Sequence, residues 1–151
     1  MPAPCKIKEL KGKEYRCFFE LTLSIIGGKW KPVILFHIAQ EGVMRFGELR
    51  KSIPDITQRM LTKQLRELEA DGLIRRKVYR QVPPKVEYRL KTPAIKLIPI
   101  LLQMRAWGVE YENSQIHECV VGKGYECPDE PIVAPMYFDH IKNRIKSLVS
   151  G

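Results

Sequence analysis

The hydrophobic period of the sequence changes at Gly72, and this change constrains the fold more than any other feature. Before it, Leu61, Leu65 and Leu68 recur at spacings of four and three, which is the pattern of an amphipathic helix. After it, apolar and charged residues alternate, which indicates a strand. Glycine is common just beyond a helix C-terminus. The sequence therefore predicts a helix over residues 57–70 that is followed by a strand.

Two alternating segments, residues 74–79 and 85–90, surround a stretch that contains two prolines, residues 81–84. Proline has no backbone N–H to donate to a β-ladder, so this stretch is expected at the tip of a β-hairpin. Arg80 and Lys85 flank the tip. The predicted hairpin is therefore basic.

The chain upstream of residue 57 predicts three shorter helices. Their apolar spacing places them near residues 17–26, 30–41 and 46–53. The pair Gly27-Gly28 disfavours helix and separates the first two, whereas Pro54 must end the third. The third helix, a short turn and the next helix form a helix-turn-helix, and the basic hairpin completes a winged helix. The predicted fold class is therefore α+β, mainly α with a small β-hairpin, in a winged helix-turn-helix.

Positive charge is concentrated in the same part of the chain. Residues 45–91 hold thirteen Lys and Arg against six Asp and Glu, a net charge of +7 out of +9 for the whole chain. A basic patch of this kind favours a polyanion partner such as double-stranded DNA. A solvated surface that binds nothing is the alternative.

If the partner is DNA, the N-terminal half of the helix over residues 57–70 is expected in the major groove. There Gln58 matches the edge of adenine, and Arg59 or Lys63 matches guanine. Arg66 is expected at a phosphate, and the hairpin cations beside the backbone or in the minor groove. The candidate DNA-binding residues are Thr57, Gln58, Arg59, Thr62, Lys63, Arg66, Arg75, Lys77, Arg80, Lys85 and Arg89.

A further helix is predicted from Thr92-Pro93 to about Tyr111, and it is apolar around most of its circumference. Such a helix needs cover on more than one side, which a small domain can hardly supply. We therefore predict a homodimer, with a central helix inside one chain as the alternative. Two copies would place their DNA-reading helices about 34 Å apart, so the operator should be an inverted repeat.

The two ends of the chain are less informative. Residues 1–14 lack apolar periodicity and are expected to be a flexible extension, whereas residues 15–112 form the winged-helix domain with its dimerisation helices. Residues 113–151 form a C-terminal extension of unknown role, in which the pattern is compatible with a hairpin and a last helix. A hairpin that turned at Lys123 would bring Cys119 and Cys127 within disulfide range.

Cys17 stands at the expected N-terminus of the first helix, beside Arg16. A helix N-terminus and a nearby cation both favour thiolate, which is the reactive form of cysteine. An inert buried thiol is the alternative reading.

Several stretches resemble the HxlR family of bacterial and archaeal winged-helix transcription regulators, which are related to the MarR type. They are CFFELTLSIIGGKWKPVIL, RFGELRKSI, TQRMLTKQLRELEADGLIRR, VEYRLKTP and a Trp-Gly pair, in the family's order between residues 17 and 112. The resemblance implies a dimeric DNA-binding repressor or activator, and we expect a repressor. In some members it also implies a cysteine switch, which makes Cys17 a candidate sensor of oxidants or electrophiles.

Other classes of function find less support. The longest apolar run, residues 97–102, is far shorter than the roughly 20 residues of a membrane span. The lysine-rich start does not resemble a secretory signal, so a cytoplasmic protein without a membrane partner is expected. Nothing indicates catalytic residues, a metal site or a cofactor, and the effector is unknown. A thiol-dependent enzyme using Cys17 and a nonspecific nucleic-acid-binding protein remain the alternatives.

Overall fold

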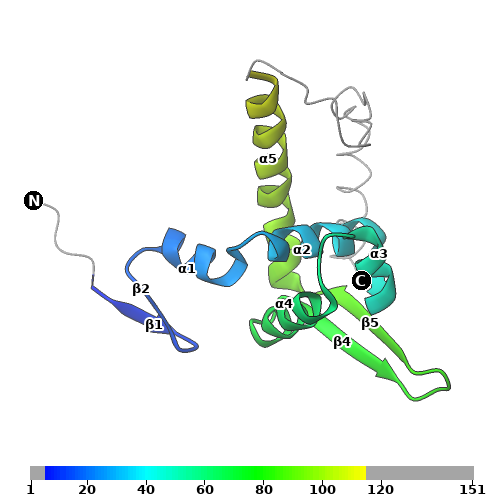
Figure 1. The fold of residues 1–151 in the computed structure, drawn as a ribbon. Coiled ribbons are helices and arrows are strands. Elements are labelled where there is room, and N and C mark those ends of the chain that lie inside the picture. Colours follow the sequence, from blue (N-terminus) through cyan, green and yellow to red (C-terminus); the bar gives the residue numbers. More distant parts are fainter. Residues whose placement is uncertain (1–5, 115–151) are drawn as a thin grey trace, which may run out of the picture. The chain divides into compact units, whose positions relative to one another are not determined.

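The computed structural model describes residues 6–114, whose elements follow in the order drawn in Figure 1. The chain forms two compact units, Met1–Ala94 and Ile95–Gly151, so the boundary falls within the predicted domain of residues 15–112. The elements are β1 (Lys8–Leu10), β2 (Lys13–Tyr15), α1 (Phe18–Ile26), α2 (Trp30–Glu41), β3 (Val43–Arg45), α3 (Phe46–Ser52), α4 (Gln58–Ala70), β4 (Ile74–Tyr79), β5 (Lys85–Leu90) and α5 (Thr92–Ser114).

The predicted helix-turn-helix is confirmed as α3 and α4. Thr57 caps α4, because its hydroxyl oxygen accepts a hydrogen bond from the backbone N–H of Met60 at 3.2 Å. Gly72 follows the C-cap residue Asp71 with a φ of 78°, a conformation that glycine adopts without steric cost. The polar cap and the glycine therefore fix both ends of this helix.

A three-stranded antiparallel sheet in the order β3-β5-β4 completes the winged helix. The β4–β5 hairpin extends away from α3 and α4 in Figure 1. Val78 pairs with Val86 and Tyr79 with Lys85, so the tip falls where the two prolines predicted it. The sequence did not predict β3, which adds a strand beside β5. Three residues are too few to display an alternating pattern.

The predicted apolar faces of the helices form the core of the first unit. α2 contacts α4 and β5, and α4 contacts β4, so the helices and the sheet share one interior. Leu61, Leu65 and Leu68, the residues that predicted α4, are all buried. The largest fully buried side chains of this unit are Ile34, Leu35, Ile38, Leu49, Leu61, Leu65, Leu68 and Ile74.

The N-terminal segment corrects the sequence prediction. A flexible extension was expected over residues 1–14, but β1 and β2 form an antiparallel hairpin there. Its two-residue turn consists of Lys11 and Gly12, which both have positive φ values, 51° and 73°. Such turns match the twist of antiparallel strands. The strands were missed because each has three residues and both are largely polar.

The first helix, α1, begins after its N-cap residue Cys17, as the sequence predicted, and ends at Gly27. It exposes three large hydrophobic side chains, Phe18, Phe19 and Leu23.

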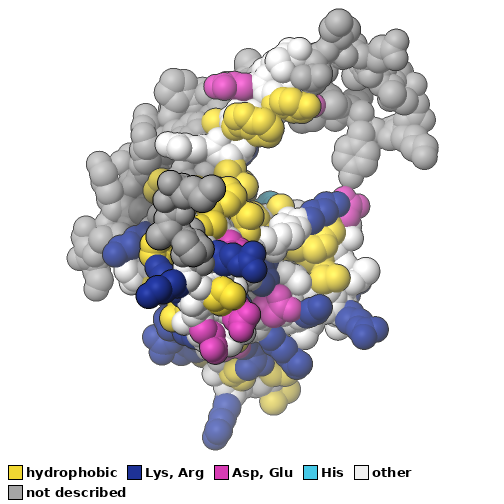
Figure 2. All heavy atoms as spheres, turned by 90° about the vertical axis from the view of Figure 1, so that its left-hand side faces the viewer, with side chains coloured by type: hydrophobic (Ala, Val, Ile, Leu, Met, Phe, Trp, Pro, Cys, Tyr) yellow, Lys and Arg dark blue, Asp and Glu magenta, His cyan; other side chains and the backbone are white. Residues whose placement is uncertain are grey.

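The last described helix, α5, has its own exposed apolar face. Ile100, Met104, Trp107 and Tyr111 recur at spacings of four and three and are each more than half exposed. The rings of Trp107 and Tyr111 stack with 5.1 Å between their centroids. Hydrophobic side chains on this helix appear in yellow in the upper part of Figure 2. We call these four residues the α5 ridge.

Within residues 6–114, no helix is long and apolar enough to cross a membrane. The predicted hairpin and helix of the C-terminal extension lie outside the described residues, as do Cys119 and Cys127.

Candidate nucleic-acid interface

The outer face of α4 carries the predicted base-contacting residues together. A shallow concavity of about 740 Å³ lies over this face. Its lining consists of Gln58, Arg59, Thr62, Lys63, Arg66 and Glu67. The leucines of the same helix are buried on the opposite side, so burial of the core turns these polar groups outward.

The cations of this face are open to a partner. Arg59, Lys63 and Arg66 are exposed. Lys63 has 67% of its side chain exposed and a distant ion pair with Glu67, 3.9 Å from nitrogen to oxygen. Among the ion pairs found in residues 6–114, none involves Arg59 or Arg66. Because exposed pairs contribute little energy, all three cations are available to an anion.

The remaining predicted residues of α4 are held by local hydrogen bonds. The Thr57 hydroxyl oxygen is engaged in capping, and the Thr62 hydroxyl donates to the carbonyl of Gln58 at 2.8 Å. Arg50 of α3 donates from Nη1 to the side-chain oxygen of Gln58 at 2.7 Å. The amide of Gln58 is thereby oriented, and among the hydrogen bonds found within residues 6–114 none uses its NH₂ group. Sequence reasoning missed Arg50, because the contact depends on how α3 and α4 cross.

Two cations of the wing, the β4–β5 hairpin, pair with a single carboxylate. Lys85 Nζ lies 2.7 Å from Glu87 Oε1, Arg89 Nη2 lies 3.8 Å from Oε2, and the Tyr79 hydroxyl donates to Oε2 at 2.9 Å. The ammonium groups of Lys77 and Lys85 each lie 4.7 Å from the centre of the Tyr79 ring. The hydrogen bond from Lys85, and then that from Tyr79, lower the pKa of Glu87.

This cluster makes the predicted wing residues unequal. Lys85 is 24% exposed and paired with Glu87, and Arg89 is also within reach of that carboxylate. Arg75 and Arg80 are exposed at the base and at the tip of the wing. The sequence held the signal for this difference, because strand alternation puts Glu87 on the same face as Lys85 and Arg89.

A second concavity, of about 340 Å³, lies between α4 and the sheet and contains an arginine that sequence reasoning missed. Arg76 shares its strand face with Ile74 and Val78, which marked that face as inward. In the structure Arg76 is exposed and lines this concavity together with Arg66. The full lining is Phe46, Thr62, Leu65, Arg66, Glu69, Arg76, Val86 and Tyr88.

Cys17 is an exposed free cysteine at the start of α1. Its sulfur accepts from the backbone N–H of Glu20 at 3.4 Å, and the Glu20 carboxylate accepts from the N–H of Arg16 at 2.7 Å. The side chain therefore caps the helix while remaining open to solvent. Of the predicted thiol sites, only Cys17 lies in the described part of the chain.

Comparison with known proteins places this helix-turn-helix and wing in a family. The HxlR-like helix-turn-helix model matches residues 25–116. The chain belongs to the HxlR family. The match covers α2 to α5, and residues 117–151 lie outside it.

Similar proteins that carry a helix-turn-helix or regulator name support the HxlR assignment. The helix-turn-helix transcriptional regulator YdeP of Bacillus subtilis is 57% identical over 97 residues, which are 64% of this chain and 75% of YdeP. The redox regulator HypR in its oxidised form is 53% identical with a TM-score of 0.60, over 67% of this chain and all of that chain. The transcriptional regulator YodB of B. subtilis, in its reduced form, is 32% identical with a TM-score of 0.53, over 62% of this chain and 91% of YodB.

Proposed function

We propose that this HxlR protein is a sequence-specific DNA-binding transcriptional regulator, acting as a repressor on an inverted-repeat operator. The observation that carries the proposal is the outer face of α4, where exposed Arg59, Lys63 and Arg66 lie beside a basic wing. An open basic face on a helix-turn-helix fits the major groove in width and in charge. We call α4 the recognition helix.

The proposal assigns different contacts to different residues. Gln58, Arg59 and Lys63, in the N-terminal half of the recognition helix, would face base edges, where their donors and acceptors discriminate between base pairs. Arg66 and the exposed wing cations Arg75 and Arg80 would contact phosphates, with Thr57, Thr62, Lys77, Lys85 and Arg89 at the margins of the interface. Phosphate contacts supply affinity, whereas the base contacts supply the preference for one sequence.

A homodimer is part of the same proposal. The α5 ridge exposes large apolar side chains, and α1 exposes Phe18, Phe19 and Leu23. Each of these two elements, taken by itself, exposes several large apolar side chains, and exposed apolar patches mark sites of protein association. A second copy related by a twofold axis would present a second recognition helix to the next half-site of an inverted repeat.

The salt dependence of binding tests the proposal. Fluorescence anisotropy would measure the affinity of the full chain for the DNA upstream of its own gene and for random DNA of equal length. With on the order of six to ten phosphates neutralised, affinity should fall by about 10³ to 10⁵ between 50 and 200 mM salt. A flat salt response would argue against DNA binding. Equal affinity for both DNAs would instead favour a nonspecific nucleic-acid-binding protein.

We further propose that Cys17 makes operator binding responsive to oxidants or electrophiles. The exposed thiol at the N-cap of α1 supports this, as does similarity to the redox regulator HypR. The thiolate would attack one oxygen of hydrogen peroxide, break the O–O bond and form sulfenic acid with release of hydroxide, which alters the sulfur that caps α1.

Peroxide or a quinone is expected to release the wild-type protein from its operator and to leave the Cys17→Ser variant bound. Serine retains a helix cap but cannot be oxidised in this way. Anisotropy before and after treatment provides the measurement, with a Cys119→Ser, Cys127→Ser double variant as the control. Equal release of the wild type and Cys17→Ser would remove Cys17 from the proposal.

A further inference from the structure

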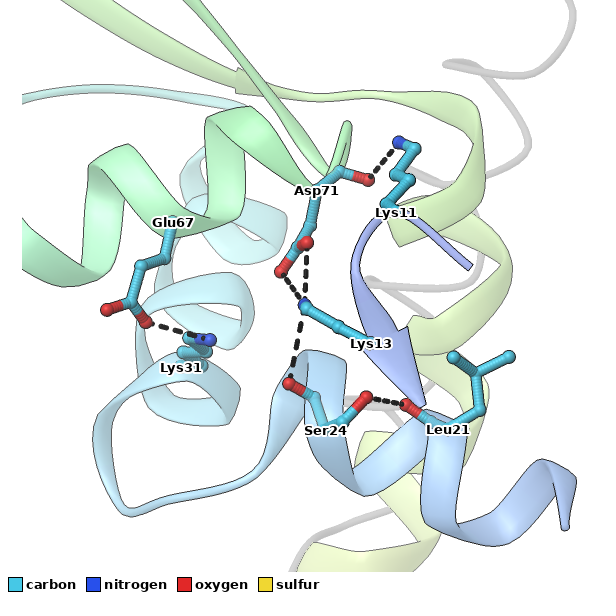
Figure 3. Close-up of polar contacts among 7 residues, drawn as sticks. All are labelled: Lys11, Lys13, Leu21, Ser24, Lys31, Glu67 and Asp71. Carbon is cyan, nitrogen blue, oxygen red and sulfur yellow. Dashed lines mark hydrogen bonds and ion pairs between the residues drawn. The ribbon is translucent and has the colours of Figure 1, made fainter. Parts of the chain in front are cut away.

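The N-terminal hairpin contacts the C-terminal end of the recognition helix (Figure 3). Lys13 Nζ donates to both carboxylate oxygens of Asp71, at 2.7 and 2.8 Å, and to the backbone carbonyl of Ser24 in α1 at 3.4 Å. Lys11 Nζ donates to the carbonyl of Asp71 at 3.5 Å. One residue at the end of α4 therefore receives two lysines from the hairpin.

The ion pair between Lys13 and Asp71 is partly buried rather than fully exposed. The Lys13 and Asp71 side chains are 28% and 12% exposed, so solvent screens their attraction incompletely. An ammonium group has three donors, and Lys13 directs them at three acceptors. Both lysines also lie at the negative end of the α4 dipole, where cations are favoured.

The shape of the hairpin turn permits this close approach. The tight turn at Lys11 and Gly12 brings the hairpin to the helix end. On the other side stands Gly72, where an added Cβ would lie 3.8 Å from Lys11 Nζ. That distance is an ordinary van der Waals contact, so glycine is favoured here by its positive φ of 78°, which ends α4, and the lysine lies directly beside it.

A third lysine, from another element, pairs with the same side of α4 one turn earlier. Glu67 and Asp71 are four residues apart, so their side chains lie on the same face of the helix. Lys31 of α2, which is buried, lies 2.9 Å from Glu67 Oε2. Figure 3 shows the two ion pairs side by side along α4. The C-terminal half of the helix is thus held from two separate elements.

We propose that Lys13 is a positioning residue for DNA recognition, which acts through Asp71 to set the direction of the recognition helix. This inference rests on the proposed DNA-binding function. A helix of 13 residues is about 20 Å long, so a tilt of about 5° at its C-terminal end displaces its N-terminus by about 2 Å. The donor–acceptor distance of a hydrogen bond to a base varies by only about 0.5 Å. The ion pair between Lys13 and Asp71 would therefore control whether residues at the other end of the helix reach the bases.

Two substitutions that break the same ion pair with opposite changes of charge test the proposal. Lys13→Gln removes a positive charge and Asp71→Asn removes a negative one. If Lys13 acts only through its charge, operator affinity falls in the first variant and rises in the second. Positioning instead predicts that both variants lose operator affinity relative to random DNA, each by about threefold or more.

Matched controls and a rescue complete the experiment. Lys6→Gln and Glu9→Gln make the same two charge changes, both in the N-terminal segment, and no ion pair found within residues 6–114 involves either residue. Lys13→Glu combined with Asp71→Lys reverses the pair and should recover the ratio of operator to random affinity. Thermal unfolding by circular dichroism identifies any variant that does not fold. If one of the two single variants fails to fold, the other single variant and the reversed pair test the proposal.

Two outcomes separate the inference from the function on which it rests. If the wild type shows no preference for its operator, the proposed function fails. If the wild type has that preference and Asp71→Asn matches or exceeds it, while Lys13→Gln behaves like Lys6→Gln, the positioning role of Lys13 is overturned.

Discussion

Replacing Trp107 with glutamate is expected to convert the proposed dimer into a monomer and to weaken operator binding by about thirtyfold or more. Trp107 lies in the middle of the α5 ridge, is 64% exposed and stacks on Tyr111. Tryptophan at the centre of an interface commonly contributes about 2 kcal/mol or more to association. A carboxylate at that point would also lose its hydration without gaining a partner.

Sedimentation velocity over a range of concentrations provides the measurement. Asn113→Glu is the matched control, because it adds the same charge to the same helix at an exposed position outside the ridge. A wild-type protein that stays monomeric at all concentrations would refute the dimer. A Trp107→Glu variant that remains dimeric would show that the α5 ridge is not its interface.

Arg59→Ala is expected to lower affinity for the operator by about five- to 150-fold and to change affinity for random DNA much less. The physical reason is that a bidentate contact between arginine and guanine discriminates by about 1–3 kcal/mol. The exposed guanidinium on the outer face of α4 is available for such a contact. Binding to operators with single base changes would show relaxed preference at one position in each half-site.

Arg80→Ala is the matched comparison, since it removes the same side chain from the exposed tip of the wing. We expect it to weaken binding to operator and random DNA by the same factor. It should also reduce the slope of log affinity against log salt concentration by about one, as expected for one lost phosphate contact. Parallel losses in Arg59→Ala and Arg80→Ala would contradict the division between base and phosphate contacts.

Features that depend on neighbouring residues were predictable from sequence. The sequence offered Asp55 or Thr57 as the cap of α4, with Gly72 at its other end, and Cys17 at the start of α1, because caps involve groups three or four residues away. The structure selects Thr57. The leucine spacing that predicted the inner face of α4 also placed its cations outward. The helix-turn-helix, the wing and the composition of its basic face follow from such local signals.

Weak local patterns explain what was missed in the fold. β1, β2 and β3 have three residues each, so neither their alternation nor their pairing stands out in the sequence. β3 exists because β5 offers it a partner, with Met44 opposite Tyr88. The N-terminal hairpin likewise depends on pairing between Lys8 and Tyr15 rather than on propensity alone.

The sequence by itself determined the helices, their caps, the wing and the face of α4 that carries positive charge, because period and capping act over a few neighbouring residues. Only the tertiary structure decided which charges remain free and which are paired. Lys13 and Asp71 are 58 residues apart, and Arg50 reaches Gln58 only once α3 and α4 have crossed. Side chains that are distant in sequence come into contact only after the core has fixed the backbone. The hydrophobic period of the sequence therefore cannot predict such contacts.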